Sequence, residues 1–299
     1  MILCCGESLI DMLPRTATTG EASFAPVAGG SVFNTAIALG RLGAPAGYFG
    51  GLSNDLFGQV LSKALSESRV DASLAPRSER PTTLAFVTLT NGQAQYAFYD
   101  EMTAGRMLTP ADLPTLTDGV EALFFGGISL VSEPAADSYA ALCAGAGERL
   151  VMMDPNIRPG FVTDEAGYRA RLAAMLSRAD IVKISDEDMF WLGTTPEQLL
   201  EGGVALVLET RGAVGVSART AAGEMLVPAR KAEVVDTVGA GDTFNAGLLA
   251  GLWRAGLLSR EGVRDASLEA LRPAVALGAA AAAVTVSRAG ANPPWANEL

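Results

Sequence analysis

Two carboxylates flank a Gly-Ala-Gly turn in the stretch Asp236-Thr237-Val238-Gly239-Ala240-Gly241-Asp242-Thr243-Phe244. Apolar residues then recur at helical spacing from Phe244 to Leu252, which predicts that a helix begins here. The first amides of a helix have no intrahelical acceptor, and the two glycines leave those of residues 239 to 242 open to a charged group. The stretch therefore predicts an anion pocket.

Asp242 is predicted to lie in the first helical turn, with its carboxylate beside this pocket. There it could accept a proton from an alcohol while the amides hold a migrating phosphoryl group. The positive end of the helix is expected to keep Asp242 ionised and therefore weakly basic, which a loose phosphoryl transfer tolerates. A glycine-rich helix start with an aspartate cap is the simpler alternative, and the stretch alone does not decide between the two.

The composition indicates a folded globular chain that can form one large α/β domain or two small ones, since 49% of its 299 residues are hydrophobic and 18% are charged. A net charge of -11 repels nucleic acid and anionic membranes, so neither is an expected partner. The chain has no histidine, which excludes Ser-His-Asp catalysis and histidine metal ligands.

A reducing cytoplasm is the expected location. Cys4, Cys5 and Cys143 show no C-x-x-C spacing and are predicted to be buried thiols. The N-terminus lacks the basic segment of a signal peptide, and the apolar run Pro273 to Val286 is shorter than the roughly 20 residues that span a membrane.

Strand and helix patterns alternate along most of the chain, which predicts a parallel sheet in three layers with helices on both faces. Strands are expected over residues 1–5, 45–51, 122–125, 150–153, 180–184 and 204–209, followed by a hairpin-like piece over 214–227. Helices are expected over residues 32–42, 56–68, 133–146, 164–177, 186–192 and 273–286, in addition to the one after Gly241.

Ligands of such a sheet bind at the carboxyl ends of its strands. Four polar segments follow predicted strands and are expected to meet at that edge: Asp11, residues 154–158 (Asp-Pro-Asn-Ile-Arg), Ser185 to Asp188, and Thr210-Arg211-Gly212. Asp11 is either a turn residue or a carboxylate that binds hydroxyl groups. Gly29-Gly30-Ser31 opens a further helix, whose Asn34 is placed to bond a ligand that lies over the glycines.

A small second sheet is predicted to stand off the main domain as a lid. Residues 82–89 and 95–99 flank Asn91-Gly92, a strong hairpin signal, and an extended piece surrounds Phe24. The expected division is a core of residues 1–12, 29–80 and 109–299 and a lid of residues 13–28 and 81–108. Phe98 and Arg106 are candidate contacts from the lid to a substrate, although an ordinary surface hairpin would also explain the pattern. An apolar lid sheet is also a surface on which a second copy could pair.

Gly29-Gly30 followed by Asn34, and Asp236 to Asp242, resemble in this order the two signatures of the ribokinase family of carbohydrate kinases, also called the PfkB family. The resemblance covers essentially the whole chain. It implies a parallel α/β domain with a β-lid and ATP-dependent phosphorylation of a sugar hydroxyl. Asp242 would be the general base, Gly239, Ala240 and Gly241 would complete the anion hole with it, and Asp11, Gly29, Gly30 and Asn34 would bind the sugar.

The same resemblance implies where nucleotide and cations bind. The nucleotide would contact Lys183, Ser185, Thr210, Arg211, Gly212, Gly215, Gly241 and Ala279. Ser185-Asp186-Glu187-Asp188 stands where many members carry Asn-x-x-Glu near the waters of Mg²⁺. Asp188 is assigned to those waters, with Asp186 or Glu187 as alternatives because aspartate is a methylene shorter than glutamate. In members that K⁺ activates, the cation site matches Asp236, Val238, Thr285, Arg288, Gly290 and Pro294.

Three segments resemble the bacterial fructokinase branch of this family, which phosphorylates fructose at its 6-hydroxyl. They are residues 154–159, residues 183–188, and Phe98-Tyr99 before Thr103-Ala104. Arg158 could stabilise charge on the moving phosphoryl group or pair with a substrate carboxylate, which would suit 2-keto-3-deoxygluconate, or it could form a structural salt bridge.

Other functions stay open at this point. Within the family, the alternatives are kinases for 2-keto-3-deoxygluconate, ribose or a nucleoside. A sugar or nucleotide sensor without turnover is disfavoured because a pure binder needs no base beside the phosphate pocket. A dinucleotide-dependent dehydrogenase is disfavoured because Gly6-Glu7-Ser8 follows the first strand in place of G-x-G-x-x-G.

Overall fold

The computed structural model describes residues 1–90 and 93–299, with side-chain surroundings given for residues 1–87 and 97–299. The turn predicted at Asn91-Gly92 lies outside the described residues. The two strands expected on either side of it are present as β7 (Leu84–Thr90) and β8 (Gln93–Tyr99), which pair antiparallel.

Eight strands form the main sheet in the order β14-β13-β12-β11-β10-β9-β1-β4. Pairing is parallel from β4 to β12, and β13 and β14 add an antiparallel hairpin at one edge. The strands read as continuous apolar runs because both faces of the sheet are covered. Their bounds are β1 Ile2–Cys5, β4 Ala46–Phe49, β9 Ala122–Gly126, β10 Leu150–Asp154, β11 Ile181–Ser185, β12 Leu206–Thr210, β13 Gly215–Thr220 and β14 Gly223–Pro228.

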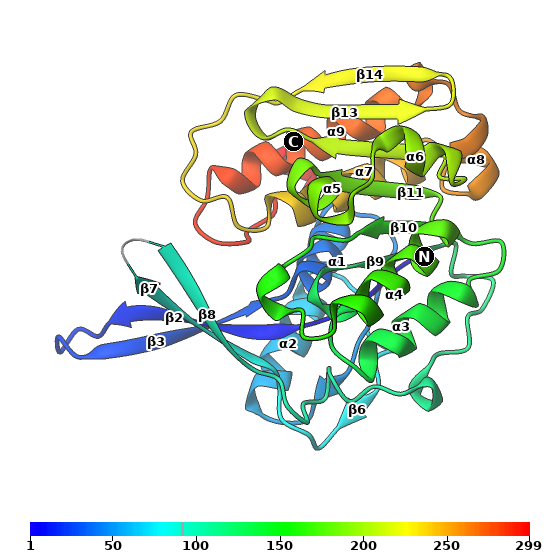
Figure 1. Cartoon of the computed structure of the whole chain (residues 1–299). Coiled ribbons are helices and arrows are strands. Elements are labelled where there is room, and N and C mark those ends of the chain that lie inside the picture. The colour runs from blue at the N-terminus through cyan, green and yellow to red at the C-terminus, as the bar shows by residue number, and fades with distance from the viewer. Residues whose placement is uncertain (91–92) are drawn as a thin grey trace.

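Helices lie on both faces of this sheet, so the predicted three-layer architecture is confirmed (Figure 1). One buried cluster holds side chains of α1, α7 and α9, and a second holds side chains of α3 and α4. Cys4, Cys5 and Cys143 are free and buried, as predicted. The helices are α1 Ser31–Arg41, α2 Leu56–Glu67, α3 Ala135–Ala144, α4 Glu165–Arg178, α5 Asp186–Leu192, α6 Pro196–Glu201, α7 Ala240–Arg254, α8 Arg260–Asp265 and α9 Leu268–Val286.

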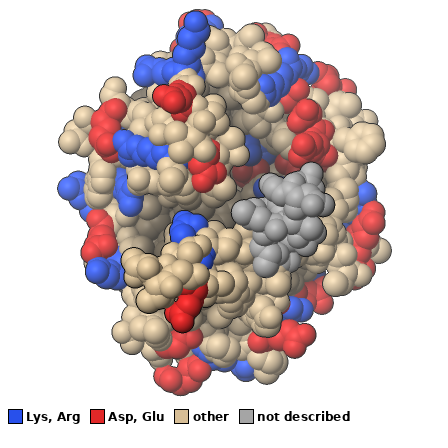
Figure 2. All heavy atoms as spheres, turned by 90° about the vertical axis from the view of Figure 1, so that its left-hand side faces the viewer, with Lys and Arg blue, Asp and Glu red and all other residues tan. Residues whose placement is uncertain are grey.

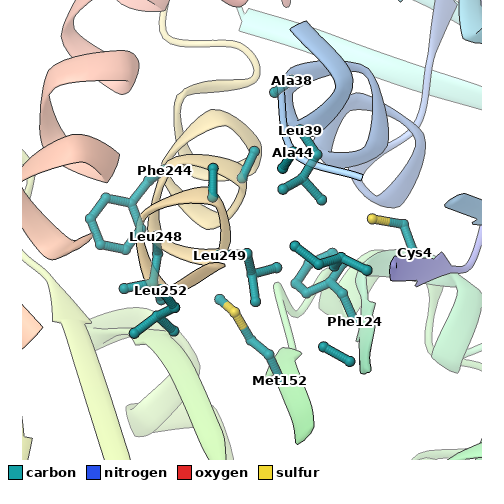
Figure 3. Packing of buried hydrophobic residues seen from close by; sticks show 14 of the residues in the cluster. Cys4, Ala38, Leu39, Ala44, Phe124, Met152, Phe244, Leu248, Leu249 and Leu252 are labelled. Carbon is teal, nitrogen blue, oxygen red and sulfur yellow. The ribbon is translucent and has the colours of Figure 1, made fainter. Parts of the chain in front are cut away.

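Helix α7 begins where the sequence predicts and is held by packing on several sides. Figure 3 shows Leu249 between Leu39 of α1 and Met152 of β10, with Phe244 on the same helix. Helix α9 approaches α7 closely, since a Cβ on Gly251 would lie 2.5 Å from the Cα atom of Ala274. The dense packing fixes the first turn of α7, which carries Asp242, relative to the sheet.

Helix α9 is longer than predicted. It begins at Leu268, where Ser267 accepts a hydrogen bond from the amide of Ala270, and it contains Pro273 in its interior. The predicted start at Pro273 was wrong because proline at the first helical position is the commoner arrangement. By length and apolarity, α9 meets the criteria for a membrane span, but it packs against α7, β13 and β14.

A four-stranded sheet, in the order β3-β2-β7-β8, projects from the body beside the carboxyl ends of the main strands (Figure 1). It contains β2 (Leu9–Thr16) and β3 (Ala22–Gly29), and we call it the lid. The sequence did not predict β2, and Asp11 lies within this strand rather than in a turn. Asp11 pairs with Ala85, which pairs with Phe98, so Asp11 and Phe98 share one face of the lid.

Candidate active site

A cavity of about 390 Å³ lies between the lid and the carboxyl edge of the main sheet. The predicted site residues that line it are Asp11, Gly30, Phe98, Arg158, Lys183, Val238, Gly239, Gly241 and Asp242. We call this cavity the cleft. On the face seen in Figure 2 the surface is hollowed near its centre, and acidic and basic side chains are interspersed around the hollow.

Asp242 is held by the first turn of α1, which packs directly against the first turn of α7. Ser31 Oγ donates to Asp242 Oδ1 at 2.6 Å, and Asn34 Nδ2 donates to Oδ2 at 3.0 Å. Asn156 Nδ2 in turn donates to Ser31 Oγ at 3.2 Å. A carboxylate offers about four lone pairs, so both oxygens keep room for an incoming hydroxyl. The arrangement orients Asp242 without consuming its capacity to accept a proton.

The pKa of Asp242 moves in the direction opposite to the one predicted. Burial raises it to about 6, although the hydrogen bonds from Ser31 and Asn34 act against the rise. The expectation of a weak base was wrong because loss of solvation on burial outweighs the field of the helix. A carboxylate whose pKa is nearer neutrality is the stronger base at physiological pH.

Beside Asp242, the start of α7 provides free donors. Within the described chain, the N–H groups of Gly241 and Asp242 donate to no protein acceptor. Lys183 Nζ lies 3.2 Å from the position that a Cβ on Gly241 would take, so the ammonium adjoins these amides. Together they form the predicted anion pocket with a cation at its side.

Lys183 belongs to a buried polar cluster beneath the cleft. Its Nζ donates to Asp154 Oδ2 at 2.9 Å, and Asn245 Nδ2 donates to the same oxygen at 2.7 Å. The Lys183 and Asp154 side chains are only 8% and 1% exposed. Asp154 Oδ1 is buried and has no hydrogen-bond partner among the described residues. The sequence placed Lys183 with the nucleotide but gave no signal for its pairing with Asp154 and Asn245.

Glu7 is a cleft residue that the sequence did not assign. It accepts hydrogen bonds from the amide of Ser31 at 2.8 Å and from Ser129 Oγ at 2.6 Å, and burial raises its pKa to about 7. Gly30 has φ of +109°, and a Cβ there would lie 2.9 Å from the Glu7 carbonyl oxygen. Glycine at this position therefore lets α1 start close to Glu7. The sequence signal that could have identified Glu7 is an acidic residue that follows a buried strand.

Asp11 reaches the cleft from β2. A Cβ on Gly29 would lie 2.3 Å from Asp11 Oδ2, so the carboxylate occupies the space that the missing side chain leaves. Burial raises the pKa of Asp11 to about 6. The lid closes over this side of the cleft through Phe98, whose ring lies 4.6 Å from that of Phe161.

Two residues that were predicted to bind a ligand instead bond to other groups of the protein. Asp188 Oδ1 accepts from the amide of Ile157 at 2.8 Å and Oδ2 from the amide of Ser185 at 3.4 Å, so this buried carboxylate caps α5 and does not line the cleft. Arg106 Nη1 donates to Asp100 Oδ1 at 3.0 Å and lines a neighbouring cavity.

The residues that the family resemblance assigns to the nucleotide lie further along the sheet edge and do not line the cleft, except for Lys183 and Gly241. Thr210 ends β12, and Arg211 pairs with Glu209 through two hydrogen bonds of 2.7 and 2.8 Å. Gly212 and Gly215 bound a short 3₁₀ turn, and Ala279 is buried on α9. Ser185 caps α5.

The segments assigned to a monovalent cation converge. Asp236 accepts from the amides of Val238 at 3.0 Å and Gly290 at 2.8 Å. Thr285 is buried, Arg288 pairs with Glu298, and Pro294 is buried in the same C-terminal segment. Across the described ranges, no group of three or more histidine, cysteine, aspartate or glutamate side chains could hold a metal.

Comparisons with known proteins agree with this geometry. The model of the pfkB family carbohydrate kinases matches residues 1–298. A fructokinase of Rhizobium leguminosarum bv. trifolii is 52% identical over 279 residues, which cover 91% of this chain and 86% of the relative. A Xylella fastidiosa fructokinase solved with bound ATP superposes with a TM-score of 0.88 at 29% identity, over 97% of this chain and 93% of that one. A Vibrio cholerae O395 fructokinase solved with fructose, ADP and calcium ion gives 0.80 at 25% identity, over 97% and 94%.

Proposed function

The chain belongs to the pfkB family of carbohydrate kinases, and we propose that it transfers the γ-phosphoryl group of ATP to the 6-hydroxyl of D-fructose. The observation that carries the proposal is the position of Asp242, which Ser31 and Asn34 orient beside the amides of α7 and the Lys183 ammonium. The 52% identity to a fructokinase supports fructose as the acceptor.

The proposed transfer proceeds in one displacement. The 6-oxygen forms a bond to the γ-phosphorus, the bond from that phosphorus to the β,γ-bridging oxygen breaks, and ADP leaves. Asp242 accepts the hydroxyl proton, and the amides of Gly241 and Asp242 receive the charge of the moving group. Lys183 and Arg158 add positive charge. Arg158 lies exposed at the cleft and, among the described residues, donates only to the adjacent carbonyl of Ile157.

We propose that the sugar lies between the lid and α1. Asp11 offers an acceptor for sugar hydroxyls, and Asn34 offers the second N–H of the amide that already donates to Asp242. Gly29 leaves the space that the Asp11 carboxylate occupies, and Gly30 lets α1 start beside the Glu7 carbonyl. Phe98 contacts Phe161 at one wall of the cleft, and we expect the lid to close further over bound sugar, which would exclude water that otherwise takes the phosphoryl group.

ATP would lie along residues 210–215 toward the cleft, and Mg²⁺, when bound with ATP, would neutralise phosphate charge. Asp154 Oδ1 is a buried cleft acceptor without a partner among the described residues, which fits a metal-bound water better than Asp188 does. We assign K⁺ to the backbone around Asp236 and Gly290. A cytoplasmic location is consistent with ATP as the donor and with three free, buried cysteines.

A coupled assay of ADP release over a panel of acceptors tests the substrate. With Mg²⁺ and K⁺, kcat/KM for fructose is expected to exceed that for 2-keto-3-deoxygluconate, ribose and a nucleoside by about 100-fold, because each analogue leaves buried polar groups of the site unpaired. Replacement of K⁺ by Na⁺ is expected to lower activity. Turnover of the sugar acid without turnover of fructose would overturn the assignment, and binding of fructose and ATP without ADP release would indicate a sensor.

We also propose that a second copy pairs through the outer face of the lid. Phe24, Phe86 and Tyr99 stack edge to face on it, and Phe24 and Tyr99 are 44% and 62% exposed. Sedimentation velocity at rising concentration is expected to show a dimer that Phe24→Ser dissociates. Phe190→Ser, which removes an equally apolar exposed ring from α5, is the control and should leave the dimer intact. A monomer at every concentration would contradict the pairing.

A further inference from the structure

A second cavity, of about 360 Å³, adjoins the cleft. Phe98, Ile128 and Phe161 line both, so these three side chains form the boundary between them. Ser132 and Thr163 bring hydroxyl groups to the second cavity, which we call the side pocket. An acceptor whose reacting hydroxyl lies at Asp242 would direct its opposite end toward this boundary.

The basic side chains of the side pocket are already paired, and Asp164, which accepts from the amide of Gly167 at 3.0 Å, adds a further carboxylate to its lining. Arg106 Nη1 donates to Asp100 Oδ1 at 3.0 Å, and its Nε donates to the carbonyl of Glu133 at 3.2 Å. Arg171 donates to Glu133 Oε1 at 2.6 Å and to Asp137 Oδ1 at 2.8 Å. Among the described residues, Arg106 and Arg171 are the two basic side chains that line the pocket, and each has an acidic partner.

The Asp100–Arg106 pair is held by its own turn. The amide and the hydroxyl of Thr103 both donate to the Asp100 carbonyl, at 3.2 and 2.9 Å, and the amide of Arg106 donates to Thr103 Oγ1 at 3.3 Å. Asp100 directly follows the last residue of β8, so the pair sits at the base of the lid. An anionic ligand would have to displace Asp100 from Arg106 or meet both charges of the pair.

We propose that Asp100 determines acceptor specificity: by neutralising Arg106 it makes the side pocket accept the uncharged end of a sugar and reject acceptors with a carboxylate at that end. The assignment rests on the proposed phosphorylation of a sugar in the cleft. It deepens that function, because it names a residue that separates neutral ketohexoses from sugar acids of similar size.

Asp100→Asn tests this assignment, since it keeps the size of the side chain and frees the charge of Arg106. Binding of 2-keto-3-deoxygluconate in the absence of ATP, measured by isothermal titration calorimetry, is expected to tighten by about tenfold or more, the usual gain from a charge-assisted hydrogen bond. The ratio of kcat/KM for this acid to that for fructose should rise in parallel. Asp100→Glu retains the charge and should retain the rejection of the acid.

Two further variants complete the experiment. Arg106→Gln added to Asp100→Asn should abolish the gain, because the freed cation is then gone. Glu67→Gln removes the same charge from an exposed ion pair with Lys63 on α2. This control should change neither the binding of 2-keto-3-deoxygluconate nor the turnover of fructose. An Asp100→Asn protein that is folded by circular dichroism and binds the acid no better than the parent overturns the proposal. If the parent phosphorylates no neutral sugar but Asp100→Asn still gains acid binding, the proposed function fails while the role of Asp100 stands.

Discussion

Asp242→Asn is expected to lower kcat for fructose by about 1,000-fold, within the range that loss of a general base causes, while both substrates still bind. The amide has the size of the carboxylate but cannot take the hydroxyl proton. Ser31 and Asn34 both donate to the Asp242 carboxylate, so the NH₂ group of asparagine would place a donor against one of these donors. One of the two hydrogen bonds that orient the side chain is then lost. Rapid-quench or coupled assays give kcat, and calorimetry gives the affinities for fructose and ATP separately.

Asp11→Asn is the matched control for this experiment. Asp11 lines the same cleft, and burial raises its pKa to about 6 as it does for Asp242. Because we assign Asp11 to the sugar, its variant should raise KM for fructose and leave most of kcat. An Asp242→Asn enzyme with the parent kcat would show that another group takes the proton.

The same base predicts how activity depends on pH. The active form of Asp242 is ionised, so kcat/KM should be full above the pKa of about 6 and fall as pH drops through it, by about tenfold per unit below. This fall of kcat/KM at low pH should persist in Asp11→Asn and should be absent from the residual activity of Asp242→Asn. Glu7 also titrates near 7, and its protonation would affect the start of α1 rather than the proton transfer itself.

Features that depend on neighbouring residues in the chain were predictable from sequence. The start of α7, and the strands that end at Asp154, Ser185 and Thr210, follow from apolar runs and from the chemistry of helix termini. Helices α6 and α8 were missed although Thr195 and Ser259 cap them, because each has only six residues and little apolar periodicity.

Features that depend on distant residues were not predictable in the same way. Ser31 follows the two glycines, but its bond to Asp242 joins two helices far apart in the sequence. Strand β2 was overlooked because Asp11 interrupts the apolar pattern, and only the pairing with β3 and β7 makes a strand there. The raised pKa of Asp242 results from burial under elements that no local pattern reveals.

Lys183→Met is expected to lower kcat by about 100-fold to 1,000-fold, the usual effect of removing one fixed charge-stabilising group from a transfer site. Methionine keeps a long unbranched side chain but brings no charge to the amides of Gly241 and Asp242. The substitution also leaves Asp154 as a buried carboxylate without its cation, which should cost about 3–5 kcal/mol of folding stability. Urea unfolding measures the second effect independently of the first.

Asp154→Asn combined with Lys183→Met separates catalysis from stability. The double variant carries no buried charge at this cluster, and Asn245 can still bond the new amide oxygen, so much of the lost stability should return. Activity should stay at or below the level of Lys183→Met, because neither new side chain can neutralise the moving phosphoryl group and the carboxylate assigned to a metal-bound water is also lost. Recovery of kcat together with stability would mean that Lys183 serves the fold alone, and that the amides of α7 and Arg158 suffice to hold the phosphoryl charge.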